Sequence, residues 1–292
     1  MTGKKQTLVW LAASIWLLFA SASGAATYRD LDQQQLWYLE LDTGRVVIEL
    51  NDTFAPKTVA QIKQLTRAGI YDGVSFYRVI DGFVAQAGPG DTPLSDSAIK
   101  RLGQTSIPTL PMESVLPWSN ARAFTPVQRQ DLFAPQTAFS AGFAVGLNAT
   151  SSEAWLLHCP GAVGIARGNE PDSATSDFYV VIGQAPRYLD GIMTVFGRVV
   201  WGMDKVQAIL RADPQGSGVM APDEPQTRIQ RAVLGSDLPP EQQLMLAVER
   251  TVGEAFEQKL AARKLRDHPF FFKRPPAVLD ACQVPIAVQL GT

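Results

Sequence analysis

The sequence predicts a mainly β fold: a closed eight-stranded antiparallel β-barrel with two capping helices, a long insertion and a C-terminal helical extension. Three observations support this prediction. Eight short runs are rich in β-branched and aromatic residues, two segments carry apolar residues at helical spacing, and closing the sheet would remove its exposed edges. The runs cover residues 37–41, 45–50, 75–80, 83–87, 162–166, 178–182, 194–200 and 227–234.

The first two runs should form a hairpin, because the turn-forming residues Asp42-Thr43-Gly44 separate them. A short amphipathic helix should begin at Pro56, since the first helical turn tolerates proline, and should end before Gly69. Its apolar face is formed by Val59, Ile62 and Leu65. A second helix is expected over residues 203–210, with an apolar face of Met203, Val206, Ile209 and Leu210.

Residues 92–158 lack a regular apolar pattern and contain several prolines, which interrupt helices and strands. These prolines are Pro93, Pro108, Pro111, Pro117, Pro126 and Pro135. We therefore predict an insertion of loops and short helices in this segment.

The composition changes beyond Asp237, where Pro239 and Pro240 precede a stretch with an apolar residue at every fourth position. The recurring residues are Leu244, Val248, Val252, Phe256 and Leu260. This spacing predicts a C-terminal helical extension within residues 238–292 that has one apolar face. Such a face either packs on its own protein or binds a partner, and the pattern leaves both alternatives open.

The N-terminus is predicted to be a secretory signal peptide over residues 1–26. Lys4 and Lys5 precede an apolar run over residues 8–19, and small residues follow up to Ala26. The run is shorter than the roughly 20 residues that span a bilayer. Cleavage near Ala26 and no stable membrane insertion afterwards are therefore expected, with an uncleaved anchor as the alternative.

The overall composition is 46% hydrophobic and 18% charged, with a formal net charge of −2. These values are typical of a soluble globular protein and do not suggest nucleic acid as a partner. Removal of the predicted signal peptide would leave a chain long enough for one enlarged domain or one domain with an appendage.

Two cysteines, Cys159 and Cys282, are present. An exported protein enters an oxidising compartment, where these thiols can pair in a disulfide, but two buried free thiols are an equal alternative. His158 precedes Cys159, yet the chain has two histidines in all and no second ligand pair at a zinc-like spacing. No metal is predicted.

Arg78 has an unusual place in the strand predicted over residues 75–80. In a period-2 pattern, Arg78 shares a face with Phe76 and Ile80, whereas Tyr77 and Val79 lie on the other face. A guanidinium among apolar neighbours must reach water, pair with a carboxylate or await a ligand. The strand alone favours a solvated or ion-paired arginine.

The segments 76–86 and 189–200 together resemble the cyclophilin family of peptidyl-prolyl isomerases. The resemblance covers about residues 37–91 and 161–234, within an expected cyclophilin-like domain over residues 33–237. It places Arg78 at the catalytic arginine of the family. It also implies a substrate-binding site made of Phe83, Val84, Gln86, Ala166, Arg167, Asp177, Tyr179, Leu189 and Met193.

Several residues depart from the family pattern. Met193 replaces a pocket histidine, and Asp177 replaces a glutamine that secreted bacterial members often have. Tyr188 stands where cyclosporin-sensitive members have tryptophan. These departures from the family pattern imply, at most, weak cyclosporin binding.

The resemblance implies a peptidyl-prolyl cis-trans isomerase that needs no cofactor and accelerates Xaa-Pro rotation in exported proteins. Together with the predicted signal peptide, it implies a periplasmic location. Its expected partners are proline-containing peptides and unfolded exported proteins. The alternative is a non-catalytic chaperone or docking module that binds proline-containing chains.

Overall fold

The structure is a computed structural model that describes residues 27–90, 93–118 and 123–291. The predicted signal peptide lies outside the described residues. Within the described ranges, no helix has both the length and the apolar character needed to cross a membrane. Strands in three sheets dominate the described chain, so the prediction of a mainly β fold is confirmed.

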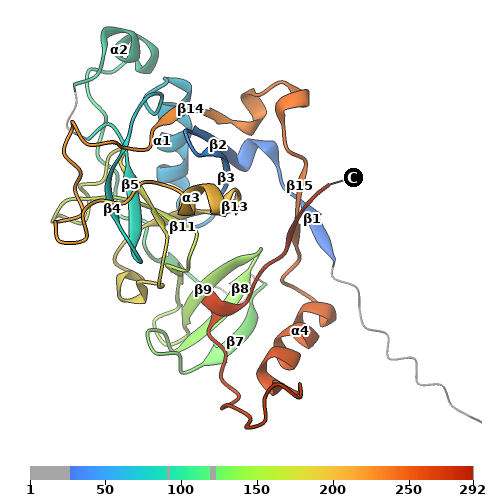
Figure 1. Cartoon of the computed structure of the whole chain (residues 1–292). Helices are drawn as coiled ribbons and strands as arrows, with labels where there is room; N and C mark the ends of the chain where they lie inside the picture. The colour runs from blue at the N-terminus through green and yellow to red at the C-terminus, as the bar shows by residue number, and fades with distance from the viewer. Residues whose placement is uncertain (1–26, 91–92, 119–122, 292) are drawn as a thin grey trace, which may run out of the picture.

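An antiparallel sheet of eight strands forms the upper part of the molecule, and each predicted run supplies one strand (Figure 1). In spatial order the strands are β14 (Ile229–Leu234), β2 (Leu36–Leu41), β3 (Gly44–Leu50), β13 (Val195–Trp201), β11 (Ala162–Ile165), β12 (Phe178–Val181), β5 (Val84–Ala87) and β4 (Phe76–Ile80). The first predicted hairpin is present as β2 and β3.

The sheet is curled into a half-barrel and does not close, so the prediction of a closed barrel is wrong. Its edge strands, β14 and β4, approach each other near an isolated bridge between Ser75 and Arg228. The loop 218–220 covers the remaining edge of β4, where Arg78 and Val219 form a second isolated bridge. This loop satisfies backbone groups that a closing strand would otherwise have to pair.

Two helices pack on the main sheet, α1 (Pro56–Arg67) against β14 and α3 (Met203–Gln207) against β3. The buried face of α1 includes Val59, Ile62 and Leu65, as predicted. The second helix ends earlier than predicted, before Ile209. The core between helices and sheet is aromatic: Trp37 and Phe178 are fully buried, with ring centroids 4.9 Å apart in an edge-to-face arrangement.

The insertion contains a second antiparallel sheet, so the prediction of loops and short helices is wrong for most of it. Its strands, in spatial order, are β6 (Leu116–Pro117), β10 (Glu153–Leu156), β9 (Phe143–Asn148), β8 (Gln136–Ser140) and β7 (Thr125–Arg129). One short helix, α2 (Asp96–Leu102), precedes them. The hairpin turn of β8 and β9 has positive φ at Ala141 and Gly142, and alanine gives none of the Asn-Gly or Asp-Gly signal of such turns.

The described C-terminal segment contains one α-helix, α4 (Glu254–Leu265), and two strands, β15 (Leu246–Glu249) and β16 (Val288–Leu290). They form a third sheet with β1 (Tyr28–Asp30). The predicted helical stretch from Leu244 to Leu260 is therefore wrong in its first half. A spacing of four is also a multiple of two, so the same residues share a face in an extended chain. Gly253, with φ of 94°, separates the strand from the helix.

The insertion sheet and α4 lie together below the main sheet (Figure 1). Phe256 and Leu260 of α4 are buried in a cluster with Phe139 of β8, and the rings of Phe139 and Phe256 are 5.4 Å apart. The apolar face of α4 thus packs on its own protein. A disulfide between Cys159 and Cys282 links the end of the insertion to the C-terminal segment.

Candidate active site

Three predicted site residues form a row across adjacent strands of the main sheet. Arg78 on β4 is the cross-strand partner of Gln86 on β5, and Gln86 is in turn the partner of Tyr179 on β12. Residues directly opposite each other in a sheet project from the same face. The fold thus brings the guanidinium and the amide of one hairpin together with an aromatic ring that is far away in sequence.

A β-bulge near the start of β4 determines which side chains face the site. The pairing register shifts between Phe76 and Arg78, so the simple alternation expected for this strand is broken. Phe76 and Val79 are buried in the core, whereas Tyr77 and Arg78 are both half-buried. The prediction that Phe76 and Arg78 share a face is wrong, because the bulge inserts one extra residue.

Tyr77 joins the site through a chain of hydrogen bonds that starts at Arg78. The Arg78 guanidinium donates to Gln86 Oε1 at 3.3 Å, and Gln86 Nε2 donates to the Tyr77 hydroxyl at 2.6 Å. The Tyr77 hydroxyl then donates to Asp177 Oδ2 at 2.6 Å. All three bonds point in the same direction, from a cation to an anion, and such chains polarise and strengthen one another.

The environment of Tyr77 raises its pKa well above the usual value. Burial is the largest cause, and the hydrogen bond and negative charge of Asp177 add to it. The hydroxyl therefore remains a proton donor at neutral pH. Sequence reasoning missed Tyr77, since an alternating strand places it away from Arg78.

Asp177 also fixes the turn that follows β5. Its Oδ1 accepts a hydrogen bond from the backbone N–H of Gly90 at 3.0 Å. Gly88 passes so close that an added Cβ would lie 2.2 Å from Asp177 Oδ1 and 2.7 Å from its Cα. Only a residue without Cβ fits there, so Asp177 and the 88–90 turn form one packed unit.

Arg78 forms no ion pair within the described part of the chain. Its hydrogen bond to Gln86 is the only side-chain bond found for it among these residues. The two other guanidinium nitrogens are not among the buried polar atoms without a partner, so they remain accessible to solvent. This geometry agrees with a solvated arginine and leaves two donor groups available to a ligand.

Apolar site residues lie in a second, adjoining group. Five of the predicted residues belong to one hydrophobic cluster: Phe83, Val84, Ala166, Tyr179 and Met193. The same cluster contains Phe143, Val145 and Leu147 of β9 and Leu156 of β10. The insertion sheet therefore packs on the apolar side of the site. Leu189 is half-buried in the adjacent short 3-10 helix Arg187–Leu189 and is not part of this cluster.

A surface groove of about 880 Å³ lies beside the apolar cluster. Four predicted residues line it, together with Tyr77: Gln86, Ala166, Arg167 and Asp177. Arg78, Phe83, Tyr179 and Leu189 do not line this groove. The structure thus divides the predicted site into a polar groove and an apolar cluster, and Ala166 belongs to both.

Arg167 is committed largely to the backbone of its own loop. It donates to Gly168 O at 2.9 Å and to Ile192 O at 3.1 Å, which ties it to the segment that carries Met193. Its Nε is buried without a hydrogen-bond partner. The side chain therefore shapes one wall of the groove.

The comparisons with known proteins agree with this fold. The curled eight-stranded sheet is the fold of a cyclophilin-type isomerase. A family model described as cyclophilin type peptidyl-prolyl cis-trans isomerase/CLD matches residues 36–233. The chain belongs to this family.

Relatives and solved structures give the same result. A probable peptidyl-prolyl cis-trans isomerase of Brucella suis is 32% identical over 219 residues, which cover 73% of this chain and 91% of the relative. A peptidyl-prolyl cis-trans isomerase of Streptomyces antibioticus is 31% identical over 180 residues, covering 59% and 81%. The crystal structure of cyclophilin AquaCyp293 from Hirschia baltica is similar with a TM-score of 0.68 and 28% identity, over 91% of this chain and 94% of that one.

Proposed function

We propose that this chain accelerates the rotation of Xaa-Pro bonds in exported proteins, with Arg78 as its catalytic residue. The family gives the reaction class. The position of Arg78 carries the proposal: it lies in a row with Gln86 and Tyr179, and it has no ion-pair partner in the described chain. Its guanidinium is thus available to a bound peptide.

Rotation of a prolyl bond requires loss of amide resonance, with a barrier of about 18–20 kcal/mol. In the twisted state the prolyl nitrogen becomes pyramidal and regains a lone pair, to which a guanidinium can donate a hydrogen bond. A hydrogen bond to a charged group contributes about 1.5–3 kcal/mol, and each 1.36 kcal/mol changes the rate about tenfold. Arg78 would therefore supply about a ten- to hundredfold acceleration.

The remaining acceleration would come from selective binding of the twisted peptide. The half-buried Phe83 and Met193 would contact the proline ring, and the buried Val84 and Tyr179 of the same cluster would support them, with Leu189 in the adjacent 3-10 helix. The groove lined by Gln86, Ala166, Arg167 and Asp177 would hold the flanking peptide. Tighter binding of the twisted form than of either planar isomer lowers the barrier.

Export is supported by two features of the chain. The predicted signal peptide directs secretion, and the disulfide between Cys159 and Cys282 suits an oxidising compartment. We propose the periplasm as the location. Expression in a Gram-negative host, followed by cell fractionation and N-terminal sequencing, should recover a periplasmic protein that begins near Thr27. Recovery of the full-length chain in the cytoplasm would contradict this location.

A second candidate function is the binding of proline-containing chains without useful turnover. Met193 is apolar and cannot replace the polar contacts of a histidine, and the Asp177 carboxylate is already engaged by Tyr77 and Gly90. Measuring peptide affinity and exchange together separates the two functions. Binding of an Ala-Pro peptide without faster cis-trans exchange would favour the binding module, whereas faster exchange supports the isomerase.

A further inference from the structure

Tyr179 is held in place from two sides. On β12 it lies opposite Gly164 of β11, where an added Cβ would approach the Tyr179 hydroxyl oxygen to 2.4 Å. The Tyr179 ring therefore packs against the backbone of Gly164, which has no side chain. Its hydroxyl is 2.9 Å from His158 Nε2, and the two rings are nearly parallel, with 10° between their planes and 6.1 Å between their centroids.

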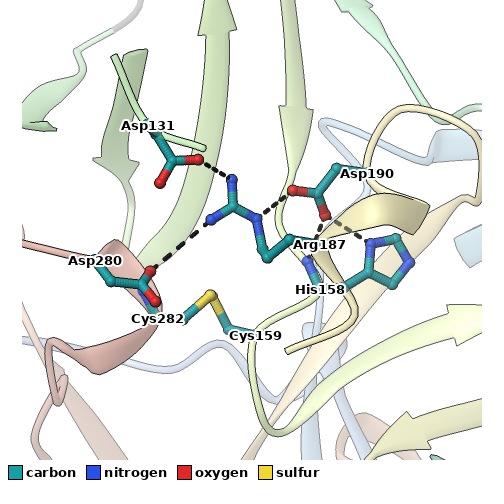
Figure 2. The surroundings of a disulfide bond; sticks show 7 residues. All are labelled: Asp131, His158, Cys159, Arg187, Asp190, Asp280 and Cys282. Carbon is teal, nitrogen blue, oxygen red and sulfur yellow. Dashed lines mark hydrogen bonds and ion pairs between the residues drawn. A yellow bond between two sulfur atoms is a disulfide. The ribbon is translucent and has the colours of Figure 1, made fainter. Parts of the chain in front are cut away.

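His158 is fully buried, and its orientation is fixed by Asp190. Figure 2 shows the Asp190 carboxylate pointing toward the His158 ring on one side and Arg187 on the other. Asp190 Oδ1 is 2.9 Å from His158 Nδ1 and also accepts the backbone N–H of His158 at 2.9 Å. A carboxylate only accepts, so Nδ1 carries the hydrogen. In the neutral ring, Nε2 then accepts from the Tyr179 hydroxyl.

Arg187 connects this pair to two other parts of the chain. It is buried and donates to Asp190 Oδ2 and also to Asp131 Oδ1 of the insertion, the latter at 2.7 Å. It also forms an ion pair of 3.8 Å with Asp280, two residues before the disulfide-bonded Cys282 (Figure 2). Asp190, which orients His158, is thus linked through Arg187 to the insertion and to the C-terminal segment.

We propose that His158 is a positioning residue, which holds the Tyr179 ring in place within the apolar cluster that forms the proline pocket. This proposal rests on the proposed role of Tyr179 as the aromatic of the proline pocket. A phenylalanine would need no such support, but a buried tyrosine hydroxyl is costly without a partner. His158 supplies that partner, and the hydrogen bond limits the rotation of the ring.

A double-mutant cycle tests the proposal. His158→Leu leaves the Tyr179 hydroxyl buried and unpaired, so kcat/KM for an Ala-Pro peptide should fall about tenfold. In the Tyr179→Phe background no hydroxyl is left, so the same substitution should change kcat/KM by less than about threefold. Equal losses in the two backgrounds, or no loss in the first, would overturn the proposal.

A spectroscopic measurement covers the case in which His158→Leu does not fold. The chain has two histidines, and His268 is exposed, so the ring nitrogens of His158 are readily assigned by ¹⁵N NMR. The wild type should show a protonated Nδ1, because this nitrogen faces the Asp190 carboxylate. Tyr179→Phe should shift the Nε2 resonance and leave Nδ1 protonated, and an unchanged Nε2 would overturn the proposal.

These readouts also separate this proposal from the proposed function. Wild-type exchange that depends on Arg78, together with no effect of His158→Leu, would reject the positioning role alone. Absence of wild-type exchange would reject the isomerase function, while the ¹⁵N shifts would still report whether His158 holds Tyr179.

Discussion

The Tyr77 hydroxyl donates a 2.6 Å hydrogen bond to Asp177, although 100 positions separate the two residues in sequence. This bond ends the chain that begins at Arg78 and passes through Gln86. Asp177, a departure from the family pattern, therefore has a structural partner in Tyr77. The hydrogen-bond chain that begins at the Arg78 guanidinium therefore ends at a residue that lines the groove.

We expect Tyr77→Phe to lower kcat/KM for an Ala-Pro peptide about three- to tenfold. The substitution removes the acceptor for Gln86, a neutral hydrogen bond of about 0.5–1.5 kcal/mol, and the donor to the Asp177 carboxylate, and we expect part of this loss to reach Arg78. Exchange NMR measures the effect, with Tyr28→Phe on β1 as a matched control. Equal activity of the two variants would show that the chain of bonds does not support Arg78.

The pH dependence of stability should report the environment of Tyr77. Because its pKa is raised in the folded state, the folded protein keeps a proton that the unfolded chain loses above about pH 10. The stability that the neutral Tyr77 hydroxyl contributes is fully present below about pH 10 and is lost as the pH rises toward the pKa of Tyr77 in the folded state. Urea unfolding between pH 9 and 11 should show a shallower decline for Tyr77→Phe than for the wild type. Equal declines in the free energy of unfolding for the two proteins would contradict a raised pKa of Tyr77 in the folded state.

Reduction of the disulfide should destabilise the protein. Cys159 and Cys282 are 123 positions apart, and closing a loop of this length stabilises the folded state by about 5 kcal/mol in the chain-entropy description. Urea unfolding with and without a reductant should show a large loss for the wild type. The free energy of unfolding of the double variant Cys159→Ser/Cys282→Ser should not change with the reductant. If the free energy of unfolding of the wild type does not change either, the prediction is wrong.

Cyclosporin binding should be weak, and Tyr188→Trp should strengthen it about tenfold. Tyr188 is 62% exposed, so an indole can be accommodated at this position without repacking the core. Isothermal titration calorimetry compares the variant with the wild type and with Tyr28→Trp, which adds an indole elsewhere. Nanomolar binding by the wild type would contradict the prediction.

The main sheet could be predicted from sequence because its strands are short runs of β-forming residues between clear turns. The open edge of this sheet could not be predicted. The backbone of the 218–220 loop covers β4, and backbone pairing cannot be seen in the pattern of side chains. The insertion sheet was missed because its β8–β9 turn uses Ala141 before Gly142. The stretch around Val248 was misassigned because its spacing of four fits a strand as well as a helix.

The site was predictable where it depends on residue identity, as for Arg78 and Gln86, which the structure places side by side. It was not predictable where it depends on register. The bulge brings Tyr77 to the face of Arg78, and the fold brings His158 to Tyr179. Neither arrangement follows from local sequence, because the first depends on the pairing register of β4 with β5 and the second on tertiary packing.

Cis-trans exchange of an Ala-Pro peptide, measured by NMR, tests most directly whether Arg78 accelerates prolyl rotation. The wild type should accelerate exchange, and Arg78→Ala should reduce the effect at least tenfold, since a charge-assisted hydrogen bond is worth about that much or more. Arg228→Ala, which removes an exposed arginine next to β14, should retain wild-type exchange. No acceleration by the wild type, or full activity of Arg78→Ala, would contradict the account.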